Sequence, residues 1–414
     1  MLGDLSPLAG FAQRFQTDPI PEPSLDVMRL CALDWAMCGL ATSRDPILAS
    51  MVQHAALAGA GASSVFYTPD VIAHGGADRL PARAAALING TISHTLDLDD
   101  THFGHIGHVS TVVIPAALAV AEDIGADFDR FIHAARIGAE VACRVGLWFG
   151  RTHYQAGWHQ TATSGAYGAA VGAAILMDAN VTASLLNVAG LATGQKAQFG
   201  SAMKPLNAGM AAAHGVEAAQ LAKAGLTGSP DVLDAVMSTM AGEGNTSAFD
   251  DLGEAWMFDT VSHKYHACCH GTHAMIEAIK SLGPLDHQDV ARIDVVTHSR
   301  WMTVCNKPMP KSWLEGKFSY ACLAALTLCG ETTLGEGPEL YFPLDGRAPA
   351  RGIMDRVTVR ADDSLAETAC EIVVTRGDGT VQKASHDLAA PEPLAKRREK
   401  VRAKGENILF HGLT

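Results

Sequence analysis

Hydrophobic residues recur at helical spacing through most of the chain and change to strand-like alternation near its end. Between Ser24 and Trp35, apolar side chains return every three to four residues, as they do on the buried face of an amphipathic helix. Similar spacing and helix-start signals predict further helices over residues 46–57, 80–96, 111–122, 128–146, 160–177, 181–191 and 208–226. We therefore expect residues 1–264 to form an all-helical domain.

After this helical region, the spacing of apolar residues changes. Residues 292–298 and 356–360 alternate apolar and polar positions, as strands do. Residues 371–375 and 380–383 flank a Gly-Asp-Gly turn and predict a hairpin. With a helix expected over 318–329, the pattern predicts a smaller α+β domain at 265–390, and a C-terminal helix, 391–414, that joins the helical domain.

The charge composition argues against some classes of binding partner. The chain has 414 residues, with 44 acidic and 31 basic side chains and a net charge of −13, which argues against nucleic acid or an anionic membrane as a partner. An anionic substrate would need a local cationic pocket. Nine cysteines, an odd number, do not suggest a disulfide framework, and the longest uncharged stretch is too polar for a bilayer span, so we expect a cytoplasmic protein.

The densest titratable cluster lies between two predicted helices. Within residues 97–108 the chain carries three carboxylates and three imidazoles, and two glycines interrupt the segment. Polar groups of this kind are costly to bury, and such clusters often mark functional sites. We interpret the segment as a catalytic or ligand-binding edge; a solvated acidic loop is the structural alternative.

Three further features of the sequence are candidates for catalytic or ligand-binding roles. His159 precedes a helix start, where the neutral imidazole is favoured, although it is also typical of an ordinary structural histidine. Lys204 is nearly isolated among uncharged residues beside another helix start, so it is either a carboxylate anchor or a surface lysine. Residues 263–273 combine cysteine and histidine, but the paired spacing typical of zinc sites is absent, and we expect no metal.

Four motifs in chain order resemble the MmgE/PrpD family. The first combines Asn-Gly at 89–90, the pattern His-x-x-Asp-x-Asp-Asp-Thr at 94–101, His-x-Ser at 108–110 and Pro-Ala-Ala-Leu-Ala at 115–119. The second is Lys-Pro-Leu-x-x-Gly-x-Ala-Ala at 204–212, followed by Gly215 and Ala218-Ala219. The remaining two are Lys-Tyr-x-x-Cys and Gly-Thr-His within 264–273, and Lys-Phe-Ser-Tyr at 317–320.

The resemblance implies a fold and an activity. The family includes 2-methylcitrate dehydratases, cis-aconitate decarboxylases and iminodisuccinate epimerases, which work without a cofactor. Its members are typically homodimers with a large helical domain and a smaller α+β lid domain. The resemblance thus implies a lyase acting on a small di- or tricarboxylate, with an epimerase of an imino- or amino-dicarboxylate as the alternative. From another class, a metal-dependent hydrolase using the histidine clusters stays open.

The resemblance also implies site residues. The implied catalytic residues are Asp97, His108, His159, Lys204 and His273. The implied substrate-binding residues are Thr101, His105, Met203, Thr272 and Tyr320. Two departures from the family pattern bear on the substrate. Val109 replaces a proline and the interval before His108 is one residue longer, so His105 is the alternative motif histidine, and Asn207 stands where many members have histidine.

Overall fold

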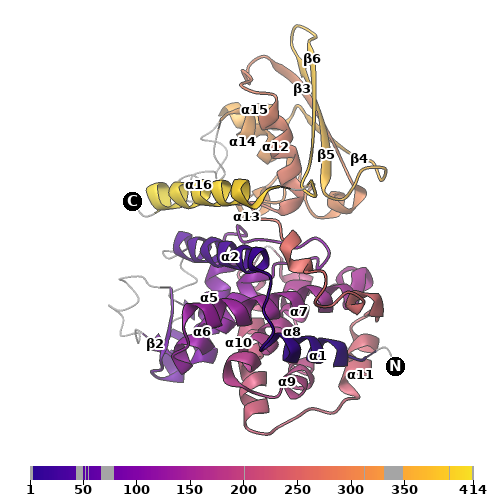
Figure 1. Cartoon of the computed structure of the whole chain (residues 1–414). Helices are drawn as coiled ribbons and strands as arrows, with labels where there is room; N and C mark the ends of the chain where they lie inside the picture. The colour runs from indigo at the N-terminus through magenta and orange to yellow at the C-terminus, as the bar shows by residue number, and fades with distance from the viewer. Residues whose placement is uncertain are drawn as a thin grey trace. The chain divides into compact units, whose positions relative to one another are not determined.

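The computed structural model divides the chain into two compact units, Met1–His263 and Lys264–Thr414, and each is described by itself. The structure describes residues 3–42, 50–51, 53–54, 56–66, 79–199, 201–311, 313–330, 348–390 and 392–412. The expected helix at 46–57 falls partly outside these ranges. The first unit is helical and the second is a smaller α+β unit, as the sequence predicted (Figure 1).

The first unit is built from helices, most of which follow the predicted apolar spacing. They are α1 (Ser6–Phe15), α2 (Glu22–Ala41), α5 (Ala82–His94), α6 (Ser110–Ile124), α7 (Phe128–Gln155), α8 (Gln160–Met177), α9 (Val181–Ala189), α10 (Met203–Lys223) and α11 (Val232–Thr239). Helices α1 and α11 are additional to the predicted ranges. A two-residue strand pair, Ser63–Ser64 with Arg79–Leu80, is a feature that the sequence did not predict. Within the described ranges, no helix combines the length and apolarity needed to cross a bilayer.

Helix α8 is the core of the first unit, as its small residues predicted. Every residue from Gln160 to Leu176 is buried, and the helix packs against α6, α7 and α10. A Cβ atom on Gly168 would lie 2.4 Å from the carbonyl oxygen of Gly138 in α7, so glycine is required for this close approach. The tight packing fixes the helix ends that carry the candidate site.

The second unit contains a four-stranded sheet in the order β4-β3-β5-β6 (Figure 1). Its strands are β3 (Val290–Thr297), β4 (Val357–Ala361), β5 (Ala369–Arg376) and β6 (Val381–Asp387). Strands β3 and β4 are parallel, and the other two pairs are antiparallel. The predicted strands and the β5–β6 hairpin are confirmed. The helices of this unit are α12 (His273–Ser281), α13 (Trp313–Gly316), α14 (Tyr320–Leu328), α15 (Ala348–Met354) and α16 (Leu394–Gly412).

The C-terminal helix differs from the expectation. Helix α16 belongs to the second compact unit, whereas the sequence analysis assigned it to the helical domain. The buried ammonium group of Lys404 donates to the backbone carbonyl of Lys264 at 3.0 Å, which ties the helix to the start of the second unit. The nine cysteines all lie in the described ranges, and none of them forms a disulfide bond there.

Candidate active site

The acidic segment forms a buried loop between α5 and α6. Helix α5 ends at His94, and Asp97 adopts a left-handed backbone with φ of 57°, which an aspartate tolerates better than most side chains. This turn reverses the direction of the chain, so that Asp99 returns to contact His94, the last residue of α5. The structural alternative, a solvated acidic loop, is wrong, because Asp97, Asp99 and Asp100 are all less than 9% exposed.

Backbone contacts fasten this loop to a segment far along the chain. Thr101 and Ser262 exchange two backbone hydrogen bonds, of 2.9 and 2.8 Å. The Nε2 atom of His102 lies 2.9 Å from the carbonyl oxygen of Met257, and its Nδ1 atom accepts from the backbone amide of His105. His102 is therefore a structural residue of the loop, and Thr101 is buried beside the cluster of acidic and basic groups.

Lys204 and Asp97 form a buried ion pair at the centre of the site. The Lys204 Nζ atom donates to Asp97 Oδ1 at 2.8 Å, and the two side chains are 11% and 8% exposed. The Nε2 atom of His108 lies 3.4 Å from the same carboxylate oxygen. Lys204 stands in the first turn of α10, which begins five residues earlier than predicted. The alternative interpretation of Lys204 as a surface lysine is therefore wrong.

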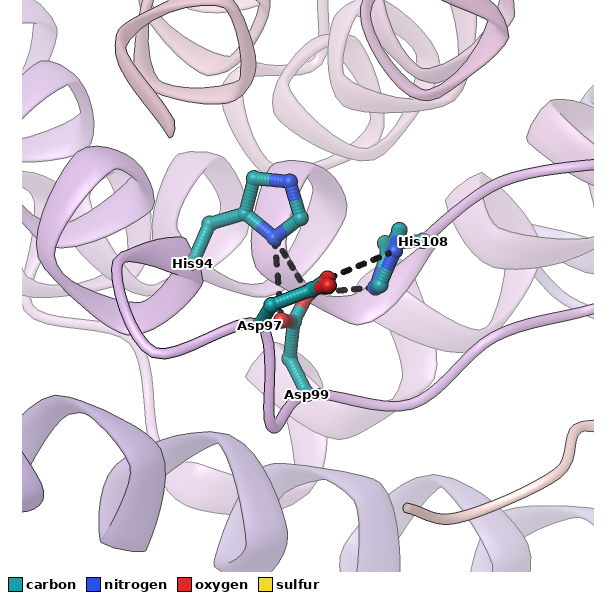
Figure 2. Close-up of side chains that lie close together, drawn as sticks. All are labelled: His94, Asp97, Asp99 and His108. Atoms are coloured by element: carbon teal, nitrogen blue, oxygen red, sulfur yellow. Dashed lines mark hydrogen bonds and ion pairs between the residues drawn. The ribbon is translucent and has the colours of Figure 1, made fainter. Parts of the chain in front are cut away.

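A second carboxylate, that of Asp99, lies between two imidazoles (Figure 2). The Nδ1 atom of His94 is 2.9 Å from both of its oxygens, and the Nδ1 atom of His108 is 2.9 Å from Oδ2. The neighbouring imidazoles hold the pKa of Asp99 well below its usual range despite its burial. Burial lowers the pKa of His94 to about 4, so its ring is neutral at physiological pH.

His159 joins the cluster from the N-cap position of α8. Its ring stacks on that of His94 with 6.1 Å between centroids, and its Nδ1 atom is 3.5 Å from the side-chain nitrogen of Asn207. Burial, and then the electrostatic interactions with the His94 ring and with the Lys204 ammonium group, lower its pKa well below the usual value. The sequence-based expectation of a neutral imidazole agrees with this direction, although burial is the larger cause.

His105 lies apart from the ion pair. It is fully buried, and its Nδ1 atom is 3.0 Å from the carbonyl oxygen of Ala142 in α7 and 3.1 Å from the Ser164 hydroxyl in α8. A Cβ atom on Gly146 would lie 2.5 Å from its ring, so the imidazole is packed tightly against α7. Of the two candidate motif histidines, His108 is the one in contact with Asp97 and Asp99.

The remaining predicted residue of the first unit is Met203. It opens α10 immediately before Lys204 and is 43% exposed. Its substrate-binding role stays a prediction. The geometry thus brings together four of the predicted residues at one place: Asp97, His108, His159 and Lys204.

The three predicted residues of the second unit form a cluster of their own. The ring of His273 is 4.6 Å from that of His270 and 5.0 Å from that of His266, between centroids. Burial and the two neighbouring imidazoles lower the pKa of His273 well below its usual value. The Tyr320 hydroxyl donates to the Gly271 carbonyl at 2.9 Å, and the Thr272 hydroxyl also donates to a backbone carbonyl. Their roles toward a substrate stay predictions.

Four side chains of the first unit are close enough to hold a metal ion. One ligand atom from each of His94, Asp97, Asp99 and His108 lies within 4.8 Å of the other three. Lys204 already neutralises Asp97, and two imidazoles contact Asp99. A divalent cation here would be repelled by the adjacent ammonium group. The arrangement therefore fits an acid–base site better than a metal centre.

Two residues of this cluster were not named from the sequence as site residues. His94 and Asp99 are part of the first motif, but their spacing alone does not show that they meet. They come together because the turn at Asp97 brings Asp99 back beneath the last residue of α5. The repeated acidic positions immediately after a helix end were the one signal that could have identified them.

Comparison with known proteins agrees with these motifs. Residues 6–247 match the model of the MmgE/PrpD N-terminal domain, which is more than half of the chain. The chain is 27% identical over 369 residues to a cis-aconitate decarboxylase of Aspergillus terreus, covering 80% of this chain and 73% of that protein. It is 28% identical over 386 residues to human cis-aconitate decarboxylase, covering 84% and 76%.

A third relative matches over a shorter stretch. The chain is 29% identical over 251 residues to a cis-aconitate decarboxylase-like protein, oryM, of Aspergillus oryzae. That match covers 55% of this chain, and the chain spans about half the length of that relative, 52%. The family-model match covers more than half of the chain and includes the two motifs around Asp97 and Lys204, and the chain therefore belongs to the MmgE/PrpD family of enzymes.

Proposed function

We propose that this enzyme is a lyase that acts, without a metal or organic cofactor, on a small di- or tricarboxylate by moving a proton next to a carboxylate. The observation that carries the proposal is the buried ammonium group of Lys204, paired with Asp97 and surrounded by the imidazoles of His94, His108 and His159. The named relatives, which are cis-aconitate decarboxylases, favour a tricarboxylate of that kind and carbon–carbon cleavage.

The ammonium group is suited to bind a substrate carboxylate. An ammonium group has three N–H donors, so Lys204 can keep one on Asp97 and offer two to the substrate. Because the pair is buried, its charge is screened little by water. The net charge of −13 would repel an anionic substrate elsewhere on the surface, so a local positive charge is needed for binding.

The imidazoles are suited to proton transfer. In a decarboxylation, the bond to one carboxyl carbon breaks, CO₂ leaves, and the electron pair stays on the substrate carbon until a proton arrives there. We assign this proton, or its abstraction in a dehydration, to His108 and His159. Acid–base groups of this kind contribute about 10² to 10⁴ in rate. The positive charge of Lys204 stabilises the negative charge that builds on the substrate.

Proton NMR in heavy water tests this proposal. The purified enzyme is incubated separately with cis-aconitate, 2-methylcitrate and iminodisuccinate. The proposal expects loss of CO₂ from cis-aconitate, with deuterium entering the product at the carbon that lost it. Water loss from 2-methylcitrate would favour a dehydratase, and exchange without net bond cleavage would favour the alternative, an epimerase of an imino- or amino-dicarboxylate. Absence of exchange with all three would refute the proposal.

A metal-dependent hydrolase is the second candidate, because four side chains lie close enough to bind a metal ion. Elemental analysis of the purified protein separates the two. We expect less than about 0.1 equivalent of zinc or manganese per chain and full turnover after dialysis against a chelator. Stoichiometric metal, lost together with the activity, would favour the hydrolase. We also propose a homodimer by family analogy, which light scattering after size-exclusion chromatography tests.

A further inference from the structure

The Asp99 carboxylate is shared by two imidazoles and is almost completely buried. It is 1% exposed, and each of its oxygens lies 2.9 Å from the Nδ1 atom of His94. One of them is also 2.9 Å from the Nδ1 atom of His108 (Figure 2). Desolvating a carboxylate is expensive unless its partners stabilise the charge, so this arrangement has a large energetic cost that the two imidazoles offset.

The chemistry of a carboxylate restricts the protons on both rings. An ionised carboxylate accepts hydrogen bonds and donates none, so the Nδ1 atom of His94, which is hydrogen-bonded to Asp99, is favoured when it carries the proton. The Nδ1 atom of His108 lies at ion-pair distance, 2.9 Å, without an aligned hydrogen bond, and the negative charge of Asp99 favours a proton on this nitrogen. Each neutral imidazole then has its proton on Nδ1 and its lone pair on Nε2. In His108, the Nε2 atom faces the ion pair, 3.4 Å from Asp97 Oδ1.

The two imidazoles are not equivalent. Burial lowers the pKa of His94 to about 4, so this ring stays neutral and donates its Nδ1 proton to Asp99. The ring of His108 is 11% exposed and reaches the side of the cluster where Lys204 is bound. His94 is thus suited to hold Asp99 in place, and His108 is suited to exchange a proton with a substrate.

We propose that Asp99 is a positioning residue: held by His94, it fixes His108 in the Nδ1–H tautomer and so presents the Nε2 atom of His108 as the base. This inference rests on the proposed function and adds to it the reason why the Nε2 atom of His108 is available for proton transfer. When Nε2 holds a proton, either taken from the substrate in a dehydration or about to be delivered to the substrate carbon in a decarboxylation, the imidazolium lies against the Asp99 carboxylate. The negative charge of Asp99 stabilises that imidazolium, as a buried carboxylate does in other acid–base sites.

The chain offers a matched control in Asp100. It is also a buried carboxylate, but its hydrogen bonds come from the hydroxyl and the backbone amide of Ser110 rather than from His94 or His108. Burial raises its pKa, so the uncharged amide of asparagine is a close substitute. Asparagine at position 99 is a poor substitute, because one amide oxygen cannot serve both imidazoles as two carboxylate oxygens do.

The test compares Asp99→Asn with Asp100→Asn on the substrate that the heavy-water screen identifies. For Asp99→Asn we expect kcat to fall by about 100-fold or more, with KM changed less than about threefold, since the ion pair that binds the carboxylate is intact. For Asp100→Asn we expect kcat to stay within about threefold of the wild type. Equal loss of kcat in both variants, or wild-type kcat in a folded Asp99→Asn protein, would overturn the proposal.

Histidine-ring ¹⁵N NMR of the unmodified enzyme provides a readout that needs no substrate. His108 is assigned by the signal that disappears in His108→Gln. The proposal expects its proton on Nδ1, and loss of that preference in Asp99→Asn. A proton on Nε2 in the wild type would overturn the proposal even if Asp99→Asn did not fold. If no substrate is turned over, the proposed function fails, yet this spectrum still decides whether Asp99 fixes the tautomer.

Discussion

Replacement of Lys204 by methionine removes the one ammonium group of the cluster and keeps most of its volume. The Nζ–Oδ1 distance to Asp97 is 2.8 Å, and both side chains are buried. At an effective dielectric constant of 20, the Coulomb attraction at that distance is about 6 kcal/mol, and desolvation offsets part of it. Breaking a buried pair from one side costs about 3–5 kcal/mol, because the remaining charge stays buried.

The Lys204→Met substitution should therefore affect stability and activity through separate mechanisms. We expect the free energy of unfolding, measured by urea denaturation, to fall by about 3 kcal/mol. We expect turnover to fall by about 10² to 10³, the usual loss when a group that stabilises developing charge is removed. Lys204→Ala, which also leaves a cavity, should lower turnover at least about tenfold by the same reasoning.

The double variant Lys204→Met with Asp97→Asn separates the two effects. Removing both charges leaves no unpaired carboxylate, so the unfolding free energy should recover by at least about 1 kcal/mol relative to Lys204→Met. Turnover should not recover, because the ammonium group is still missing. Lys196→Met is the matched control, since Lys196 donates to the Tyr154 carbonyl at 2.9 Å outside the cluster. A folded Lys204→Met enzyme with wild-type kcat and KM would refute the reasoning.

Three further predictions test the site and the packing around it. His159→Gln should lower turnover at least about tenfold without unfolding the protein, as measured by NMR assay and circular dichroism. The pKa values of His105 and His153 are lowered to about 3 and about 4, so the unfolded state binds protons first as pH falls below 6.5. Urea denaturation should then show stability decreasing by up to about 1.4 kcal/mol per pH unit for each histidine between pH 6 and 4.5, and a flat profile would contradict this. Gly168→Ala should destabilise α8 by about 1–3 kcal/mol, because its Cβ would meet a backbone carbonyl of α7, whereas Gly10→Ala, with open space around it, should be neutral or stabilising in thermal melts.

Much of the fold could be predicted from the spacing of apolar residues, because burial of one face of a helix or strand produces that spacing directly. The small residues of 160–177 predicted a central helix, and the alternation at 292–298 and 371–375 predicted strands that pair in one sheet. The start of α10 was placed too late; the helix includes Pro205, because a proline within the first turn loses no intrahelical hydrogen bond. The unit to which α16 belongs depends on tertiary packing, which local pattern does not contain.

The candidate site was predicted in part. The residue types and motifs indicated Asp97 and Lys204, and the structure pairs them across more than a hundred residues of sequence. The choice between His105 and His108 depends on which way a loop turns, and this is set by contacts with α7 and α8 that spacing does not reveal. The position of Asp99 depends on the left-handed backbone of Asp97, a conformation that no neighbouring residue type demanded.

The central claim is that buried imidazoles and the Lys204–Asp97 pair move a proton beside a substrate carboxylate. The most direct measurement is the proton NMR spectrum of cis-aconitate incubated with the wild-type enzyme in heavy water. The account predicts release of CO₂ and one deuterium in the product, and strongly reduced conversion by the Lys204→Met variant. Conversion without deuterium uptake, or equal conversion by the two proteins, would contradict it.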